Sequence, residues 1–235
     1  YASSGTYVTG LAAKNAATEL REKICAKAAQ MWDVDATDVV FDGQYVRLSD
    51  ERAAREQNRY LTLRDFANLC VKNIAGGDAL TSHASACLPV SPPPFMAGIA
   101  EVEVDKATGK VTVVDYAAAV DCGTVINEAL ARVQAEGGIA QGIGHALYEI
   151  VEHDERGRLR TGNFMSYKLP TRLDIGSIRV AFEPSYEPTG PFGAKSIAEV
   201  VITTPLAAVA SAVAHATGHQ VRSLPITPEK ALLGE

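Results

Sequence analysis

Glu199 is the carboxylate in this sequence best suited to act as a general base. It ends the segment GPFGAKSIAE (residues 190–199), and no other carboxylate lies between Glu187 and Glu229. Residues 200–202 are all apolar. Because a carboxylate at the edge of an apolar run is partly desolvated, it accepts a proton more readily than a fully solvated one. The alternative is a surface ion pair with Lys195, four residues earlier on a helical turn.

A glycine-rich segment, QAEGGIAQGIG (residues 134–144), could contact a ligand through Gln141. The side-chain amide of Gln141 could donate a hydrogen bond to an oxo or phosphate oxygen. The glycine spacing differs from GxGxxG, so a dinucleotide-binding turn is not indicated. Small residues are also common where two helices cross closely. A packed helix crossing with Gln141 at its edge is therefore the alternative.

Small residues open the chain, in the order Ala2, Ser3, Ser4, Gly5 and Thr6, and a helical pattern follows them. Backbone N–H groups at the start of a helix, together with hydroxyl groups, can bind an anion such as phosphate. The same residues could also form an ordinary N-terminal cap. The sequence leaves both interpretations open.

Residues 120–127, VDCGTVIN, indicate a turn after a strand. This turn could place polar groups in a cleft, or it could cap a helix above a buried thiol. Cys122 is a poor candidate nucleophile, because no neighbour in the sequence would lower the pKa of its thiol.

The sequence offers no convincing set of metal ligands. His215 and His219 have a spacing that suits a metal on a helix, but Gly218 lies between them at a predicted helix end. The cysteines have neither zinc nor iron–sulfur cluster spacing, so we expect free thiols in a reducing cytoplasm. They are Cys25, Cys70, Cys87 and Cys122.

Hydrophobic periodicity predicts the elements that position these segments, and they alternate between helices and hairpins. An irregular stretch near 74–94 could separate two subdomains of residues 1–235. The convincing strand pairs are antiparallel, so we expect an α+β fold in which helices pack on antiparallel hairpins. The predicted helices cover residues 13–31, 63–71, 128–151 and 205–217, and the predicted strands cover residues 39–41, 45–48, 100–104, 111–116 and 178–182. Asp42-Gly43 indicates a hairpin between the first two strands, and Thr62 is expected to cap the helix at 63–71. Val133 belongs to the predicted apolar stripe of the helix at 128–151, and Pro205 is expected at the first position of the last helix.

Composition excludes several other classes of protein. Hydrophobic residues make up 47% of the 235 positions and charged residues 21%, which is typical of a globular chain rather than a disordered one. The net charge is −6 without a basic cluster, so nucleic-acid binding is not expected. The longest apolar stretches, such as residues 205–214, are too short to predict a membrane span.

The order of the motifs resembles the molybdopterin-binding subunit of the xanthine dehydrogenase and aldehyde oxidase family. After the Ser/Gly/Thr-rich opening come GLAAKNAA, EVEVDKATGKVTV, VDCGTVIN, QAEGGIAQGIGHALYE, NFMSYKLPT, GPFGAKSIAE and LPITPEK. The resemblance runs from Ala2 to Lys230 and corresponds to the C-terminal half of that subunit. Its glycine-proline-phenylalanine-glycine version is similar to bacterial members that act on nicotinate or purines.

The resemblance implies roles for the residues singled out above. Glu199 matches the glutamate that deprotonates the hydroxide on molybdenum, which then attacks an electron-poor carbon of an aromatic N-heterocycle or aldehyde. Gln141 and Gly142 match the segment beside the oxo group. The remaining matches place Ala2, Ser3, Gly5, Thr6, Lys195, Ser196 and Ala198 at the cofactor, and no residue of this chain is implied as a metal ligand.

The same resemblance implies cofactors and partners. Molybdenum-molybdopterin is expected, in its cytosine dinucleotide form, with a 2Fe–2S cluster and FAD carried by an iron–sulfur subunit and an FAD subunit or by further domains. The N-terminal half of the molybdenum subunit would complete the site, so this chain alone would be an incomplete enzyme.

One departure from the family pattern leaves a second function open. The family usually reads GxKGxGE, whereas Ser196 and Ala198 stand here at positions where glycine is common. The Ala198 methyl group could crowd the molybdenum pocket, which favours a non-catalytic scaffold that keeps the fold. A hydrolase is disfavoured, because there is no GxSxG motif.

Overall fold

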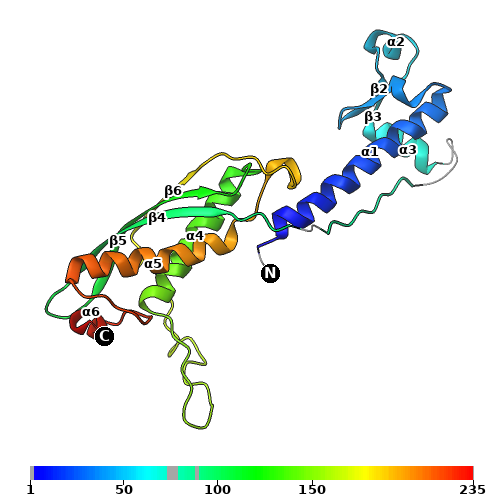
Figure 1. The fold of residues 1–235 in the computed structure, drawn as a ribbon. Coiled ribbons are helices and arrows are strands. Elements are labelled where there is room, and N and C mark those ends of the chain that lie inside the picture. Colours follow the sequence, from blue (N-terminus) through cyan, green and yellow to red (C-terminus); the bar gives the residue numbers. More distant parts are fainter. Residues whose placement is uncertain (1–2, 73–78, 88–89, 235) are drawn as a thin grey trace. The chain divides into compact units, whose positions relative to one another are not determined.

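The computed structural model describes residues 3–72, 79–87 and 90–234. The chain divides into two compact units, here called the small unit (Val8–Leu88) and the large unit (Tyr1–Tyr7 with Pro89–Glu235). One boundary between the units lies between residues 7 and 8, and the other lies between residues 88 and 89, inside the irregular stretch near 74–94. Residues 73–78 and 88–89 lie outside the described part. Figure 1 labels the elements of each unit.

The small unit packs helices on a three-stranded antiparallel sheet in the order β1-β2-β3. The hairpin predicted around Asp42 is confirmed, and the Asp42 carboxylate accepts hydrogen bonds from the N–H groups of Gln44 and Tyr45. The predicted Thr62 cap is also confirmed, because its hydroxyl accepts from the Asp65 N–H. The elements are α1 (Gly10–Trp32), η2 (Ala36–Asp38), β1 (Val39–Phe41), β2 (Tyr45–Leu48), α2 (Glu51–Glu56), β3 (Tyr60–Thr62) and α3 (Leu63–Val71). A short π-helix, η1 (Gly5–Thr9), precedes α1.

The large unit contains a second sheet in the order β4-β5-β6. The predicted antiparallel hairpin is confirmed and is longer than expected, with β4 at Phe95–Val104 and β5 at Val111–Asp121. The expectation that the strand pairs are antiparallel is wrong for β6 (Ser177–Phe182), which pairs with β5 in parallel. The chain leaves the end of β5 and passes through α4 (Glu128–Leu147) before it enters β6. Such a crossover connection returns the chain in the same direction.

The helix α4 begins after Asn127, whose side chain accepts a hydrogen bond from the Leu130 N–H at 3.0 Å. The prediction extended this helix to residue 151 and placed Val133 in its apolar stripe. Instead the helix ends at Leu147, and Val133 is 67% exposed. Tertiary packing selects a different face, because smaller residues allow the neighbouring helix to approach. The buried residues of this face include Ala135, Gly138, Ile139, Gly142, Ile143 and Ala146.

The helix α5 (Ala198–Thr217) begins seven residues before the predicted start at Pro205. Pro205 is buried inside the helix, against α4. The hydroxyls of Thr203 and Thr204 donate to carbonyls one turn earlier, in the part of the helix that precedes the proline. Packing against α4 therefore overrides the usual disruption of a helix by proline. As a result, Glu199 lies in the first turn of α5.

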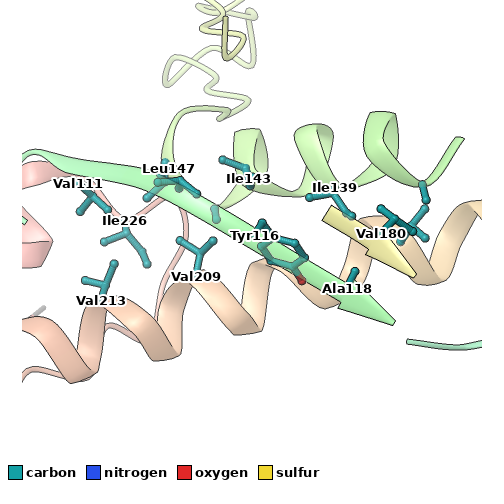
Figure 2. Close-up of a cluster of buried hydrophobic side chains, with 14 of the residues drawn as sticks. Val111, Tyr116, Ala118, Ile139, Ile143, Leu147, Val180, Val209, Val213 and Ile226 are labelled. Atoms are coloured by element: carbon teal, nitrogen blue, oxygen red, sulfur yellow. The ribbon is translucent and has the colours of Figure 1, made fainter. Parts of the chain in front are cut away.

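The core of the large unit lies between the sheet and the helices α4 and α5 (Figure 2). Ile139 and Ile143 extend from α4, Val209 and Val213 extend from α5, and Tyr116 extends from β5 (Figure 2). Tyr116 is fully buried, which raises the pKa of its phenol to about 12. The remaining elements are η3 (Pro191–Gly193) and α6 (Pro228–Leu233).

By length and composition, α5 is apolar enough to cross a membrane, with a mean hydropathy of 1.6. The apolar run 205–214, judged too short at the sequence level, thus belongs to a longer helix of 20 residues. One such helix is weak evidence for a membrane span, because core helices of other proteins have a similar length and composition. Val201, Pro205, Val209 and Val213 of α5 are buried, and 22% of its apolar window is buried in total.

Candidate functional site

A cavity of about 450 Å³ in the large unit brings together segments from distant parts of the sequence. The start of the chain, the turn after β5, the first turns of α4 and the entry to α5 all contribute. Several side chains carry hydrogen-bonding groups, and an apolar wall completes the lining. The lining residues are Ser3, Gly5, Thr6, Cys122, Thr124, Val125, Ile126, Asn127, Leu130, Ala131, Gln134, Ala194, Lys195, Ile197 and Ala198.

Part of the opening segment lies at this cavity. Ser3, Gly5 and Thr6 line it, and Gly5 is the first residue of the π-helix η1 that leads directly into α1. Backbone N–H groups in the first turn of a helix have no partner within the helix. They can bind an anion there together with hydroxyl groups. Ala2 lies outside the described residues.

The segment 190–199 is held against the turn that follows β5. The Thr124 N–H donates to the Gly193 carbonyl, and the Lys195 N–H donates to the Cys122 carbonyl, each at 2.8 Å. Gly193 has a φ of +88°, and a Cβ atom there would lie 2.3 Å from the Tyr186 ring. The glycine is therefore needed for both its backbone conformation and the close contact.

Lys195 forms a buried ion pair with Asp121, the last residue of β5. Its Nζ lies 2.6 Å from Asp121 Oδ2, and its side chain is only 8% exposed. The predicted alternative, a surface pair between Lys195 and Glu199, is therefore wrong, because Lys195 precedes α5 and its side chain turns into the fold.

The Asp121 carboxylate is stabilised in its ionised form. Burial acts to raise the pKa of this carboxyl, but hydrogen bonds from Lys195, Ser185 and the Gly123 N–H outweigh it and hold the pKa below its ordinary value. The sequence analysis singled out residues 120–127 but missed this aspartate. Its position at the end of a strand, directly before the Cys-Gly turn, was the available signal.

Glu199 is bonded to the opening segment rather than to Lys195. The Ser3 hydroxyl donates to Glu199 Oε2 at 2.9 Å, and the Glu199 N–H donates to Ser3 Oγ at 2.9 Å. The Glu199 residue is exposed, contrary to the expectation of a desolvated carboxylate. The apolar residue Val201 faces the core while Glu199, two positions earlier in the helix, faces outward.

Gln141 and Gly142 lie apart from the cavity. Gln134 lines the cavity, and Gln141 follows it by seven residues, or about 10 Å along the helix axis. Gln141 is exposed, whereas Gly142 is buried against α5. The packed helix crossing that the sequence left open is thus present at Gly142. Ser196 is likewise not among the lining residues.

A glycine substitution tests the packing role of Gly142. A Cβ atom at Gly142 would lie 2.5 Å from the Ile202 carbonyl oxygen, whereas one at Gly137 would meet no atom within 4 Å. We expect Gly142→Ala to lower the free energy of unfolding by about 1–3 kcal/mol, because backbone atoms must shift. The matched control Gly137→Ala should raise it by about 0.5–1 kcal/mol through helix propensity. Equilibrium unfolding in urea measures both, and equal effects would contradict the packing role.

The cysteines and histidines are the remaining reactive side chains that the sequence analysis considered. Among the residues described, all four cysteines are free, and burial raises the pKa of the Cys122 thiol, which disfavours a nucleophilic role. No group of three or more His, Cys, Asp or Glu residues able to hold a metal was found in the described ranges. His215 and His219 are both exposed.

The fold and the cavity define a cofactor-binding domain, and comparison with known proteins identifies its family. The family model of the molybdopterin cofactor-binding domain matches residues 1–176, and the chain belongs to that family. More specifically, it is part of the molybdopterin-binding subunit of the xanthine dehydrogenase, CO dehydrogenase and aldehyde oxidoreductase group of molybdenum hydroxylases. The resemblance and the α+β fold expected from the sequence are both confirmed.

Three relatives illustrate the similarity. The chain is 35% identical over 233 residues to a protein named "Probable hypoxanthine oxidase XdhD" from Escherichia coli, covering 99% of this chain and 24% of that protein. It is 33% identical to the xanthine dehydrogenase molybdenum-binding subunit of Escherichia coli O157:H7, covering 98% and 30%. The crystal structure of quinoline 2-oxidoreductase from Pseudomonas putida 86 matches with a TM-score of 0.79 and 29% identity, covering 98% and 30%. The chain thus spans 24–30% of the length of these proteins, less than the half that the resemblance implied.

The cavity fits part of a molybdopterin-type cofactor, a polar ring system that carries phosphate. The lining offers hydrogen-bond donors suited to phosphate and ring heteroatoms. They are the hydroxyls of Ser3, Thr6 and Thr124, the side-chain amides of Asn127 and Gln134, and the helix start at Gly5. Gln141 lies outside this set, so its implied role next to the oxo group remains a prediction.

Proposed function

We propose that this chain supplies the general base and part of the cofactor site of an enzyme that hydroxylates an aromatic N-heterocycle or an aldehyde. In this reaction a C–H bond is replaced by C–OH with water as the oxygen source, releasing two protons and two electrons. The observation that supports the proposal is the position of Glu199. Glu199 lies in the first turn of α5, next to Ala198 and close to Ile197, which both line the cavity, and its carboxylate accepts a hydrogen bond from Ser3.

Each residue of the site has a separate task in this proposal. Glu199 takes up a proton as the substrate carbon gains its oxygen atom, acting as a general base. Ser3, Gly5 and Thr6 bind the cofactor phosphate. Lys195 lines the cavity and fixes the entry to α5 through its pair with Asp121. The molybdopterin cofactor, which we propose is the cytosine dinucleotide form, supplies the redox chemistry when bound.

The proposal also requires partners in a cytoplasmic assembly. The electrons released must leave the site, and the cysteines of this chain do not have the spacing of a cluster. We therefore infer an iron–sulfur component with a 2Fe–2S cluster, an FAD component, and the remainder of the molybdenum subunit, whether on separate chains or in one.

The metal and cofactor content of the purified assembly tests this proposal. The enzyme that contains this chain should hold molybdenum, pterin, iron, acid-labile sulfide and FAD, and substrate should reduce the iron and flavin chromophores. Elemental analysis and absorbance spectra measure these quantities. An active complex without iron or flavin would contradict the electron pathway.

A non-catalytic scaffold is the second candidate, and the position of Ala198 favours it. Ala198 lines the cavity with a methyl group where glycine is common in the family pattern. Under this alternative the assembly should contain neither molybdenum nor pterin, and Ala198→Gly should increase the content of both. Full molybdenum occupancy with Ala198 in place would exclude crowding by this methyl group.

A further inference from the structure

Ser3 and Glu199 are 196 positions apart in the sequence, yet they exchange two hydrogen bonds. Ser3 Oγ accepts from the Glu199 N–H and donates to Glu199 Oε2, each at 2.9 Å. A hydroxyl group can accept and donate at the same time. The residue that precedes α5, Ile197, makes no side-chain capping bond. Ser3 therefore caps α5 from a distant segment and holds the glutamate side chain as well.

The backbone around Ser3 is itself fixed. Ser3 has a φ of +51°, a conformation that is uncommon for residues other than glycine and persists where the surrounding structure imposes it. Four residues later, the Tyr7 phenol hydrogen bonds to the Thr189 hydroxyl at 2.5 Å. Thr189 directly precedes segment 190–199, so two contacts join the opening segment to the chain on both sides of that segment.

An exposed glutamate without such a contact has several side-chain rotamers available. The bond from Ser3 selects those that keep Oε2 near the opening segment. Ser3 also lines the cavity, so whatever occupies the cavity next to Ser3 lies close to the contact that orients the carboxylate.

We propose that Ser3 is a positioning residue for Glu199: it fixes the orientation of the carboxylate, so that the segment lining the cofactor cavity also sets where the base points. The inference rests on the proposed function of Glu199. It assigns Ser3 a task in addition to the cofactor contact implied by family resemblance.

The left-handed backbone at Ser3 determines which variants are informative. Ser3→Gly removes the hydroxyl at no conformational cost, because glycine adopts positive φ readily. Ser3→Asn tolerates the same conformation and offers both an acceptor and a donor, so it should restore the contact. Ser3→Ala also removes the hydroxyl and keeps the Cβ atom that serine already carries at this φ, so it should behave as Ser3→Gly does.

The experiment uses the assembled molybdenum enzyme and two main readouts. In Ser3→Gly, hydrogen exchange at the Glu199 amide should accelerate by about tenfold, because its acceptor is lost. The limiting rate of enzyme reduction by hypoxanthine, or by quinoline or benzaldehyde if these reduce the wild type faster, should fall by roughly ten- to a hundredfold. The apparent Kd of the same compound should change little, and Ser3→Asn should restore both the exchange rate and most of the reduction rate.

Three results would overturn the inference. Unchanged amide exchange in Ser3→Gly would mean that the contact is absent from the assembled enzyme. An unchanged reduction rate would mean that the contact does not position the base. A fall in molybdenum content proportional to the fall in rate would mean that Ser3 acts by retaining the cofactor.

Glu199→Gln separates failure of this inference from failure of the proposed function. If Glu199→Gln abolishes reduction while Ser3→Gly reduces normally, only the inference fails. If Glu199→Gln itself reduces normally, the proposed function fails. In the double variant the rate should equal that of Glu199→Gln alone, because Ser3 has no base left to position.

Discussion

Replacement of Glu199 by glutamine should lower the rate of enzyme reduction by substrate at least ~10²-fold, the lower end of the effect of losing a general base. Glutamine keeps the length of the side chain, and its amide oxygen can still accept the hydrogen bond from Ser3. Glutamine cannot take up a proton, so the proton-transfer step is lost while the shape and hydrogen bonding of the site are kept. Folding, molybdenum content and substrate affinity should therefore change little. The acidic limb of the pH profile should disappear.

Stopped-flow reduction of the assembled enzyme, with molybdenum quantified, measures this effect. Glu229→Gln is the matched control, because Glu229 also lies in the first turn of a helix, α6, but its sequence neighbours do not line the cavity, as Ala198 does next to Glu199. Its reduction rate should equal that of the wild type. Each substitution should change the free energy of unfolding by only about 0–1 kcal/mol through the helix dipole. Near-wild-type reduction in Glu199→Gln would remove Glu199 as the base.

Replacement of Lys195 by methionine should lower the free energy of unfolding of the large unit by about 3–5 kcal/mol, the usual cost of breaking a buried ion pair from one side. Methionine fills a similar volume but leaves the Asp121 carboxylate without its charged partner. The carbonyl of Pro93, which accepts from Lys195 Nζ at 3.2 Å, also loses its donor. Because Lys195 and Asp121 join the segment before α5 to the end of β5, cofactor retention should fall as well.

Urea unfolding compares Lys195→Met with Arg158→Met, which removes the positive charge of an exposed ion pair. Arg158 also lies 2.8 Å from a carboxylate, that of Asp154, but its side chain is 73% exposed. The Arg158 substitution should cost only about 0–1 kcal/mol. Similar losses in both variants would show that burial gives the Lys195 pair no special importance.

The pH dependence of stability provides a second check on this pair. The pKa of Asp121 is depressed below its ordinary value of 3.8 in the folded state, so its ionised form stabilises the fold above that pH. The contribution is lost as the pH falls through the folded-state pKa. The stability difference between wild type and Asp121→Asn should therefore be constant above about pH 5 and shrink below pH 4. A difference that persists unchanged at pH 2 would contradict this assignment.

Local patterns in the sequence predicted the elements whose formation depends on near neighbours. The hairpin at Asp42 and the helix capped by Thr62 were found at their exact bounds, because turn and cap hydrogen bonds connect residues two or three positions apart. Motif order alone also indicated the family and the α+β class. The polar–apolar alternation of the sequence predicted β4 and β5 to be shorter than they are. In β5 the reason is that residues 117–119 are all alanine and carry no polar–apolar pattern.

The candidate site was only partly predictable. The opening segment, Lys195 and Ala198 were named from the sequence, and they do meet at one cavity. Gln141 and Gly142 were named too, but helix geometry places them more than a turn away from the cavity, and Gly142 contacts α5. The partner of Lys195 was misassigned, because sequence spacing suggested Glu199 whereas the fold brings Asp121 to it from 74 positions away.

Residue types and their order along the chain were enough to predict the family, the class of fold and the candidate base. The start of α5 at Ala198 rather than Pro205, the parallel pairing of β6 and the hydrogen bonds between Ser3 and Glu199 were not predictable in this way. Each of these depends on contacts between residues far apart in the chain. The energies of these contacts come from packing and hydrogen bonding between distant residues, which a local sequence pattern does not contain. In α5 the packing of Pro205 against α4 outweighs the local preference of proline for a helix start.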